Sequence, residues 1–384
     1  MSVNSQHEQV FSHVFISGIT NKRFDITIKN GVFSSIVESD ESSASPLQPS
    51  DSGRDLWIAP GVIDLHTHLA WTDFDHDDQL KRDSQEIEAL QAQAFEATLW
   101  TGVTSVRDAG GLSSATAERI RRHYAQPLSV HTCGDMLGAG DARGPEYLQQ
   151  RVKEIVDSGA TWVKILATGG LGSPSETVMN PVFAEEEFAA IVRAAHNLGV
   201  KVLVHAWGGP ALDWSIRYGV ASVEHGMFMT EDQAYRLAQS TTAFVPTVSI
   251  YRIAADPSSV LALNPVLCER AARAAEAHPN AVSYAKKAGV RMGFGTDYAT
   301  PMLHGTNLDE WDALIDCGLT RAEAWQAATS AAADILGYGD SIGRIAEGFA
   351  ADAIIFAADP YQAENARALQ ESIVTVMKGG VERR

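Results

Sequence analysis

Pro60-Gly61-Val62-Ile63-Asp64-Leu65-His66-Thr67-His68 is the stretch of sequence that decides the fold of this chain. It is an apolar, strand-like run that ends in two histidines two positions apart. Side chains alternate along a strand, so His66 and His68 project from the same face, about 6–7 Å apart along the backbone. Zinc accepts neutral imidazole nitrogens, and two of them on one face make half of a metal site. We therefore expect further ligands at the ends of later strands.

From Pro60 onward the sequence alternates short apolar strands with alanine-rich helical stretches. The expected strands are Val62–His68, Thr104–Arg107, Leu128–Cys133, Trp162–Ala167, Lys201–His205, Ser222–His225, Ala243–Thr247 and Arg291–Gly295. The helical stretches have apolar residues at three- and four-residue spacing, as in Glu86–Trp100, Glu146–Asp157, Ala184–Asn197 and Pro265–Lys287. Eight such strands predict an α/β fold, a TIM-like (β/α)8 barrel. An open doubly wound sheet is the competing layout, but no glycine-rich phosphate loop follows the first strand.

The two ends of the chain have a different texture from the middle. Val14–Gly18, Phe24–Ile28 and Val32–Val37 are β-branched and partly alternating, and Asn30-Gly31 is a strong hairpin turn. Strand texture returns at Ala353–Ala357 and Ile373–Met377. We expect residues 1–59 and 345–384 to form a small composite β-sandwich, and residues 60–344 to form the catalytic barrel.

Polar side chains stand at or near several strand ends. They are Lys164 inside the fourth strand, His205 ending the fifth, His225 ending the sixth and Asp297 after the eighth. Active sites of barrels lie at the carboxyl ends of the strands, so these side chains should meet His66 and His68. Together they supply the nitrogen and oxygen ligands that suit zinc.

These ordered motifs resemble those of the metal-dependent amidohydrolase superfamily, in particular the branch of imidazolonepropionase-like and Xaa-Pro dipeptidase-like hydrolases. The resemblance covers nearly the whole chain. Its segments are 60–68, 101–111 (TGVTSVRDAGG), 163–170 (VKILATGG), 204–206, 224–226, 293–297, 328–331 and 342–359, which contains GRIAEGFAADAIIF.

The resemblance implies two divalent metal ions, with zinc as the expected metal. His66, His68 and Asp297 would hold one ion, and His205 and His225 the second. Lys164 would be carboxylated by CO2, and its carbamate would bridge the two ions. A metal-bridging hydroxide would attack the substrate carbonyl, and Asp297 would pass its proton to the leaving nitrogen. Tyr251, Trp207 and His304 are the candidate substrate-binding residues.

The expected reaction is hydrolysis of a C–N amide bond in an N-acyl amino acid, a dipeptide or a related amide. The alternatives are a cyclic amide or imidazolone, a carbamate or aryl amide, and deamination if only one metal is bound. Arg107 and Arg252 are possible anchors for a substrate carboxylate. For Arg107 we favour a structural ion pair with the adjacent Asp108. A metal-free binding scaffold is disfavoured, because all six ligand positions are filled.

The bulk composition limits the partners of the chain. Its formal net charge of −18 argues against a nucleic-acid partner, which needs a basic stripe. No apolar run approaches the roughly 20 residues of a membrane span, and no signal peptide is visible. Cys133, Cys268 and Cys317 are scattered, as in proteins of the reducing cytoplasm. We expect a cytoplasmic enzyme with a small-molecule substrate, and homo-oligomers occur among similar proteins.

Overall fold

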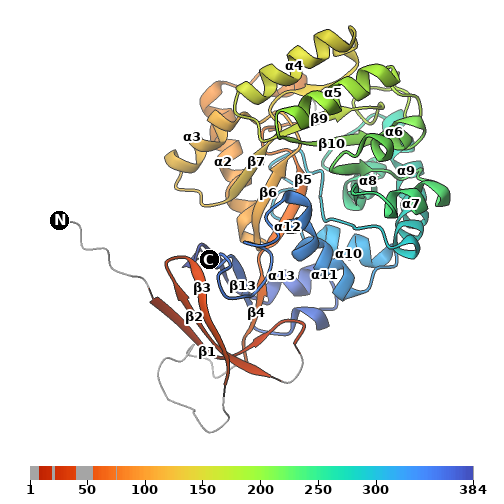
Figure 1. Cartoon of the computed structure of the whole chain (residues 1–384). Coiled ribbons are helices and arrows are strands. Elements are labelled where there is room, and N and C mark those ends of the chain that lie inside the picture. The colour runs from red at the N-terminus through yellow and green to blue at the C-terminus, as the bar shows by residue number, and fades with distance from the viewer. Residues whose placement is uncertain (1–7, 20–21, 40–54, 75, 384) are drawn as a thin grey trace.

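A computed structural model of the chain describes residues 8–19, 22–39, 55–74 and 76–383 (Figure 1). Parts of the predicted N-terminal segment 1–59 therefore lie outside the described residues. Among the described residues, no helix is both long enough and apolar enough to cross a membrane.

The structure alternates strands and helices from β5 onward. The strands are β1 (Glu8–Ile16), β2 (Arg23–Lys29), β3 (Val32–Glu38), β4 (Trp57–Pro60), β5 (Val62–Thr67), β6 (Val103–Asp108), β7 (Ser129–Thr132), β8 (Met136–Leu137), β9 (Trp162–Leu166), β10 (Lys201–Ala206), β11 (Ser222–His225), β12 (Ala243–Val245), β13 (Ala353–Phe356), β14 (Ile373–Lys378) and β15 (Val381–Glu382). The α-helices are α1 (His76–Gln79), α2 (Ser84–Trp100), α3 (Ser114–His123), α4 (Pro145–Asp157), α5 (Glu185–Asn197), α6 (Pro210–Tyr218), α7 (Glu231–Ala238), α8 (Val248–Ala255), α9 (Pro265–Ala288), α10 (Asp309–Asp316), α11 (Arg321–Ala328), α12 (Ser330–Leu336) and α13 (Ala366–Glu371). Two short 3-10 helices span Ala139–Asp141 and Pro360–Gln362.

The middle of the chain forms two parallel sheets. Their strand orders are β12-β11-β10-β9-β8 and β5-β6-β7. Every residue of β5 and β6 is buried, including the charged residues Asp64, Arg107 and Asp108, which therefore need buried partners. Figure 1 shows helices lying along the outside of these strands. Of the eight strands expected for the barrel, the first seven are present, with ends that differ by two residues or fewer.

The prediction of a regular eighth strand over Arg291–Gly295 is wrong. The segment 291–298 forms only isolated bridges, Met292 with Phe244 and Tyr298 with Thr67. Its backbone still bonds to both neighbours, since the N–H of Gly293 donates to the Phe244 carbonyl (2.8 Å) and that of Leu65 to the Phe294 carbonyl (2.9 Å). The segment runs so close to the strands beside it that a Cβ on Gly293 would lie 2.5 Å from Leu65 Cδ1.

Strands from both ends of the chain form one sheet, in the order β15-β14-β13-β4-β1-β2-β3. The two ends of this order also approach each other, since the N–H of Ala351 donates to the Gly31 carbonyl (2.8 Å). The composite β-sandwich stays a prediction. Strand β4 pairs antiparallel with β13, so that Pro60 lies opposite Ala353. The predicted Asn30-Gly31 turn joins β2 to β3, with φ of 53° and 80° at the two residues. The division into domains at residues 59/60 and 344/345 stays a prediction.

Candidate metal centre and active site

The six predicted metal ligands lie together in the structure. His66 lies in β5, one residue before its end, and His68 directly follows that strand. Lys164 lies in β9, His205 in β10, His225 ends β11, and Asp297 lies in the segment 291–298. All six line one cavity of about 750 Å³. Their roles as ligands stay predictions, but the carboxyl ends of the parallel strands place all of them at one site.

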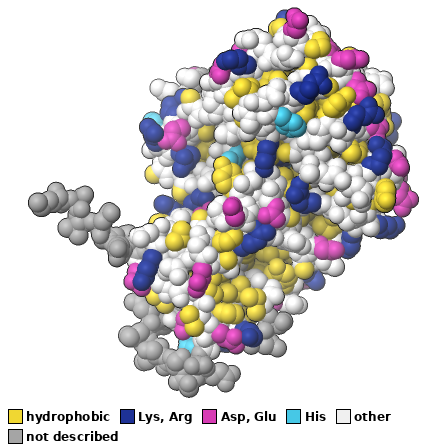
Figure 2. Space-filling model, viewed as in Figure 1, with side chains coloured by type: hydrophobic (Ala, Val, Ile, Leu, Met, Phe, Trp, Pro, Cys, Tyr) yellow, Lys and Arg dark blue, Asp and Glu magenta, His cyan; other side chains and the backbone are white. Residues whose placement is uncertain are grey.

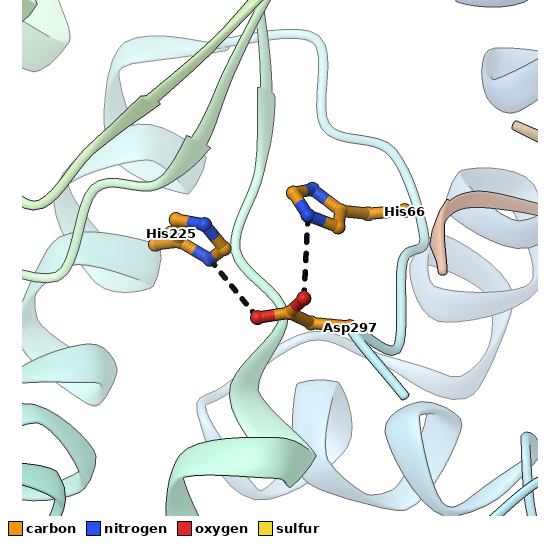
Figure 3. A group of neighbouring side chains, drawn as sticks. All are labelled: His66, His225 and Asp297. Atoms are coloured by element: carbon orange, nitrogen blue, oxygen red, sulfur yellow. Dashed lines mark ion pairs between the residues drawn. The ribbon is translucent and has the colours of Figure 1, made fainter. Parts of the chain in front are cut away.

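Asp297 lies between the histidines of the two predicted metal sites. Its Oδ1 is 3.3 Å from Nε2 of both His66 and His68, and its Oδ2 is 3.8 Å from Nδ1 of His225. Figure 3 shows this carboxylate pointing at the rings of His66 and His225. One ligand atom from each of these three residues can be chosen so that all three lie within 4.8 Å of one another.

Lys164 and His205 complete the cluster. The Nζ atom of Lys164 is 3.3 Å from Nε2 of His66. The ring centroids of His205 and His225 are 4.4 Å apart, and those of His66 and His225 are 4.9 Å apart. The two predicted ligand groups are therefore neighbours, with Lys164 beside the first group.

A second layer of hydrogen bonds orients the imidazoles. His66 donates from Nδ1 to Glu224 (2.7 Å) and His68 from Nδ1 to the Gly110 carbonyl (3.0 Å), so both present Nε2 to Asp297. Nε2 of His205 lies 3.1 Å from the Gly169 carbonyl. Nδ1 of His225 is hydrogen-bonded to Thr247 (2.8 Å). Such outer partners fix the tautomer and the direction of a ligating ring.

The ion pair between Arg107 and Glu224 was not foreseen from the sequence. Both side chains are fully buried, and Arg107 donates to Glu224 Oε1 (2.9 Å), to Ser222 Oγ (3.0 Å) and to the Leu65 carbonyl (2.6 Å). The expected pairing of Arg107 with Asp108 is wrong, because Asp108 accepts backbone N–H groups, including that of Leu69 (2.7 Å). The sequence feature that could have revealed this pair is the presence of oppositely charged residues, Arg107 and Glu224, in two predicted strands. Buried charges need partners.

The protonation states around the cavity suit metal binding. Burial, followed by the charge of Lys164, lowers the pKa of His205 to about 3. Burial also holds the pKa of His225 well below its usual value. Burial alone would raise the pKa of Asp297, but the charge and hydrogen bond of His66 outweigh it, and the pKa lies well below the usual range. Neutral imidazoles and an ionised carboxylate are the forms that bind metal ions.

Burial also lowers the pKa of the Lys164 ammonium. The donor set of nitrogen and carboxylate oxygen atoms therefore fits a borderline divalent metal, and a lysine that is easily deprotonated fits carboxylation by CO2.

Three residues at this site have left-handed backbone conformations. The φ angles are 71° at His225, 52° at Thr247 and 56° at Asp297. A non-glycine residue in this region costs on the order of 1 kcal/mol, and such residues gather at functional sites. Two of the six predicted ligands, His225 and Asp297, therefore have strained backbone conformations.

The predicted substrate-binding residues occupy different places. Tyr251 lines the cavity, where burial raises the pKa of its hydroxyl well above the usual value, so it is a neutral donor. Trp207 is fully buried behind it, and the two rings meet edge to face with centroids 5.2 Å apart. His304 is buried and hydrogen-bonded to Thr98 (3.2 Å). Among the described residues that line the cavity, neither Trp207 nor His304 is found.

The comparisons with known proteins agree with this geometry. The model of the amidohydrolase family matches residues 57–383. Ochratoxinase of Aspergillus niger is 26% identical over 363 residues, which cover 84% of this chain and 75% of that protein. Imidazolonepropionase of Klebsiella pneumoniae is 26% identical over 380 residues, covering 88% and 87%. The crystal structure of a Xaa-Pro dipeptidase with bound methionine has a TM-score of 0.85 at 24% identity, covering 98% of this chain and all of that one.

Proposed function

This chain belongs to the amidohydrolase family, and on that premise we propose that it is a metal-dependent hydrolase of an amide C–N bond in a small molecule. Membership in this family and its hydrolase relatives make it an enzyme that acts on C–N bonds. The observation that carries the finer proposal is the convergence of His66, His68, His205, His225, Lys164 and Asp297 on one cavity. The match to the amidohydrolase family also supports a barrel built from the two parallel sheets and the segment 291–298.

The residues that would hold the metals are those of the predicted set. His66, His68 and Asp297 would hold one ion, and His205 and His225 the other. Lys164 would form a bond from Nζ to the carbon of CO2 and lose a proton, which gives an anionic carbamate between the two ions. The ions would supply Lewis-acid chemistry, activating water and polarising the scissile carbonyl. Zinc suits this mixture of nitrogen and oxygen ligands.

The side chains of the cavity would direct the proton transfers. Asp297 accepts the proton of the attacking water at a carboxylate oxygen and delivers it to the leaving nitrogen. Tyr251 keeps its proton and donates a hydrogen bond to the substrate oxygen as charge develops there. Glu224, held by Arg107, keeps His66 in one tautomer.

A cyclic amide is the second candidate substrate. An imidazolonepropionase is among the relatives, and the same attack on a carbonyl carbon opens a ring. An imidazolone therefore belongs in the first substrate panel together with the open-chain amides.

Metal content is the first experiment. The full chain is purified without chelators from a culture supplied with zinc and bicarbonate, and metal per chain is measured by elemental analysis. We expect about two ions per chain and release of amine from at least one amide of the panel. About one ion per chain would overturn the carbamate-bridged pair and favour deamination. Two ions without hydrolysis of any amide, imidazolone or carbamate would overturn the proposed reaction.

A further inference from the structure

The charged side chains that line the cavity are distributed unevenly. Among the described lining residues, Glu176 and Asp297 are the acidic ones and Lys164 is the only lysine or arginine. Lys164 lies inside the metal-binding cluster, with Nζ 3.3 Å from the His66 ring. In the described part of the chain, therefore, no ammonium or guanidinium group outside that cluster lines the cavity.

Helices α8 and α9 border the cavity and carry three arginines, none of which lines it. Arg273 on α9 is exposed and lies 3.6 Å from Glu269. Arg252 on α8 forms an ion pair with Asp316 (2.7 Å). Arg270 on α9 donates to the carbonyls of Gly170 (2.7 Å), Ser173 (2.9 Å) and Pro174 (2.7 Å). A guanidinium held by three carbonyls is not available to a ligand unless the loop that carries them is released.

Glu176 brings a negative charge to the outer part of the cavity. It lies on the loop between β9 and α5, and its Oε2 accepts the N–H of Gly170 (2.8 Å). In the described structure no lysine or arginine forms an ion pair with it. The net charge of −18 adds a negative potential around the whole molecule. On the face shown in Figure 2, acidic and basic side chains are interspersed and no continuous basic area is visible.

The remaining walls of the cavity are largely apolar. They come from the loop after β5, from β8 and β9, and from α8, α9 and the segment between them. The side chains are Trp71, Phe74, Met136, Leu166, Ile250 and Leu263, with further aliphatic groups beside them. A cavity of about 750 Å³ with such walls takes an aromatic or branched aliphatic group on the substrate.

We propose that the substrate carries no carboxylate next to its scissile amide and is a neutral or cationic amide with an apolar or aromatic flank. A carboxylate bound here would lose its hydration and find no cation outside the metal cluster, and an unpaired buried charge is costly. Arginine is over-represented in sites that bind carboxylates, because its guanidinium can bind both oxygens at once, and no arginine lines this cavity among the described residues. Glu176 instead accepts an N–H or an ammonium group of the substrate. This inference rests on the proposed function and replaces the N-acyl amino acid and the dipeptide as first choices.

A matched pair of amides tests the inference directly. N-benzoylphenylalanine and N-(2-phenylethyl)benzamide share the scissile bond and both aromatic rings and differ only in the carboxylate. With the metal-loaded full chain, we expect kcat/KM to be at least tenfold higher for N-(2-phenylethyl)benzamide. Dissociation constants of the same compounds, measured by calorimetry, should follow the same order. Equal or better use of N-benzoylphenylalanine would overturn the inference.

Variants of Glu176 test its part in selection. The probes are the two aminomethyl derivatives of N-(2-phenylethyl)benzamide, with the cationic group on either ring. For the better of these two cationic probes, kcat/KM is divided by kcat/KM for uncharged N-(2-phenylethyl)benzamide. E176Q should lower this ratio at least fivefold. E176K should instead raise kcat/KM for N-benzoylphenylalanine relative to kcat/KM for N-(2-phenylethyl)benzamide. Unchanged ratios in both variants would exclude Glu176 as the selecting residue.

The two proposals fail in distinguishable ways. Hydrolysis with a preference for the carboxylate overturns the inference and leaves the proposed function intact. Absence of hydrolysis with tighter binding of the carboxylate-free amide overturns the proposed function and supports the inference. Absence of hydrolysis with tighter binding of N-benzoylphenylalanine overturns both.

Discussion

At the scale of single residues, Asp297 has the position that the proposed proton transfers require. Its carboxylate lies within 3.3 Å of the nearest ring nitrogens of His66 and His68 and 3.8 Å from that of His225. It also lines the cavity, so a carbonyl bound there lies next to the same oxygen atoms. A side chain in this place can both hold a metal and move a proton.

Replacing Asp297 by Asn should therefore abolish turnover in a folded protein. The amide has nearly the same shape but cannot accept the proton, and general acid–base catalysis contributes about 10²- to 10⁴-fold. We expect kcat to fall by about 10³-fold or more, with an unchanged circular dichroism spectrum. The matched control is Asp316→Asn, the same change at an exposed aspartate that forms an ion pair with Arg252. Turnover by D297N within tenfold of the unmodified enzyme would contradict the assigned role.

Glu224→Gln tests the layer of residues behind the metal ligands. The change removes the carboxylate that orients His66 and leaves the buried Arg107 without its charged partner. Outer-layer changes of this kind weaken metal binding by about 10- to 100-fold. Breaking a buried ion pair costs about 3–5 kcal/mol of unfolding free energy.

Metal competition with a chelator and urea unfolding of the metal-free chain measure the two effects of E224Q separately. Glu371→Gln, which alters an exposed pair with Arg367, is the control and should change neither. An unchanged metal affinity in E224Q would show that His66 does not depend on Glu224.

At the scale of elements, the loop between β9 and α5 forms a wall of the cavity and is tied to α9 by Arg270. Arg270→Ala removes three hydrogen bonds from a charged donor and should loosen this wall. Because the predicted metal ligands lie on other segments than this loop, we expect KM to rise about tenfold while kcat and metal content change little. Arg273→Ala, on the same helix and exposed, should have no effect. A fall in kcat with constant KM would assign Arg270 a different role.

Strand β7 carries a histidine whose protonation is linked to folding. Burial, followed by the charge of Lys378, lowers the pKa of His131 to about 4, and its ring lies 4.9 Å from that of Tyr338. The folded state thus binds fewer protons than the unfolded state between about pH 6.5 and pH 4. The contribution of His131 to stability is present above pH 6.5 and is lost as the pH falls through this window.

His131→Phe should flatten that part of the pH dependence. Between pH 7.5 and pH 4.5, the unfolding free energy of the unmodified chain should fall by about 2 kcal/mol more than that of the variant. Urea unfolding at the two pH values measures the difference, and carboxylates common to both proteins cancel. Parallel pH profiles would mean that His131 is protonated in the folded state as readily as in the unfolded one.

At the scale of the whole molecule, the sheet built from both ends of the chain is directly connected to the predicted metal site. Strand β4 pairs with β13, and only Gly61 separates β4 from β5, the strand that carries His66. The C-terminal strand β14 covers the other edge of β13 and buries Val376 and Met377. The far end of the sequence therefore supports the strand that begins the site.

Ending the chain at Glu371 should destabilise the whole protein and lower its metal content. The truncation removes β14 and with it the burial of Ile373, Val376 and Met377, each contributing about 1.5–3 kcal/mol. Ending the chain at Gly380, which removes only the short exposed strand β15, is the control and should change the melting temperature little. Equal melting temperatures for both truncations would show that β14 does not support the β4–β5 connection.

The sequence alone determined the features that depend on neighbours a few positions apart. Strand and helix periodicities located most strands and the helices α2, α4, α5 and α9, and the Asn30-Gly31 turn was predicted from two residues. The candidate ligands were also recognisable, because each is a polar residue at or near the end of an apolar strand. Such signals are local, and local backbone geometry follows from local sterics and hydrogen bonding.

Only the tertiary structure decided the contacts between residues far apart in the chain. Arg107 pairs with Glu224 and not with Asp108, Arg270 is engaged by the loop after β9, and Trp207 lies behind Tyr251 and not on the cavity surface. The segment 291–298 lies between two strands without forming a regular ladder, although its apolar run predicts one. These outcomes depend on the path of the backbone and on which side chains fill each space, and no short-range pattern in the sequence records either of them.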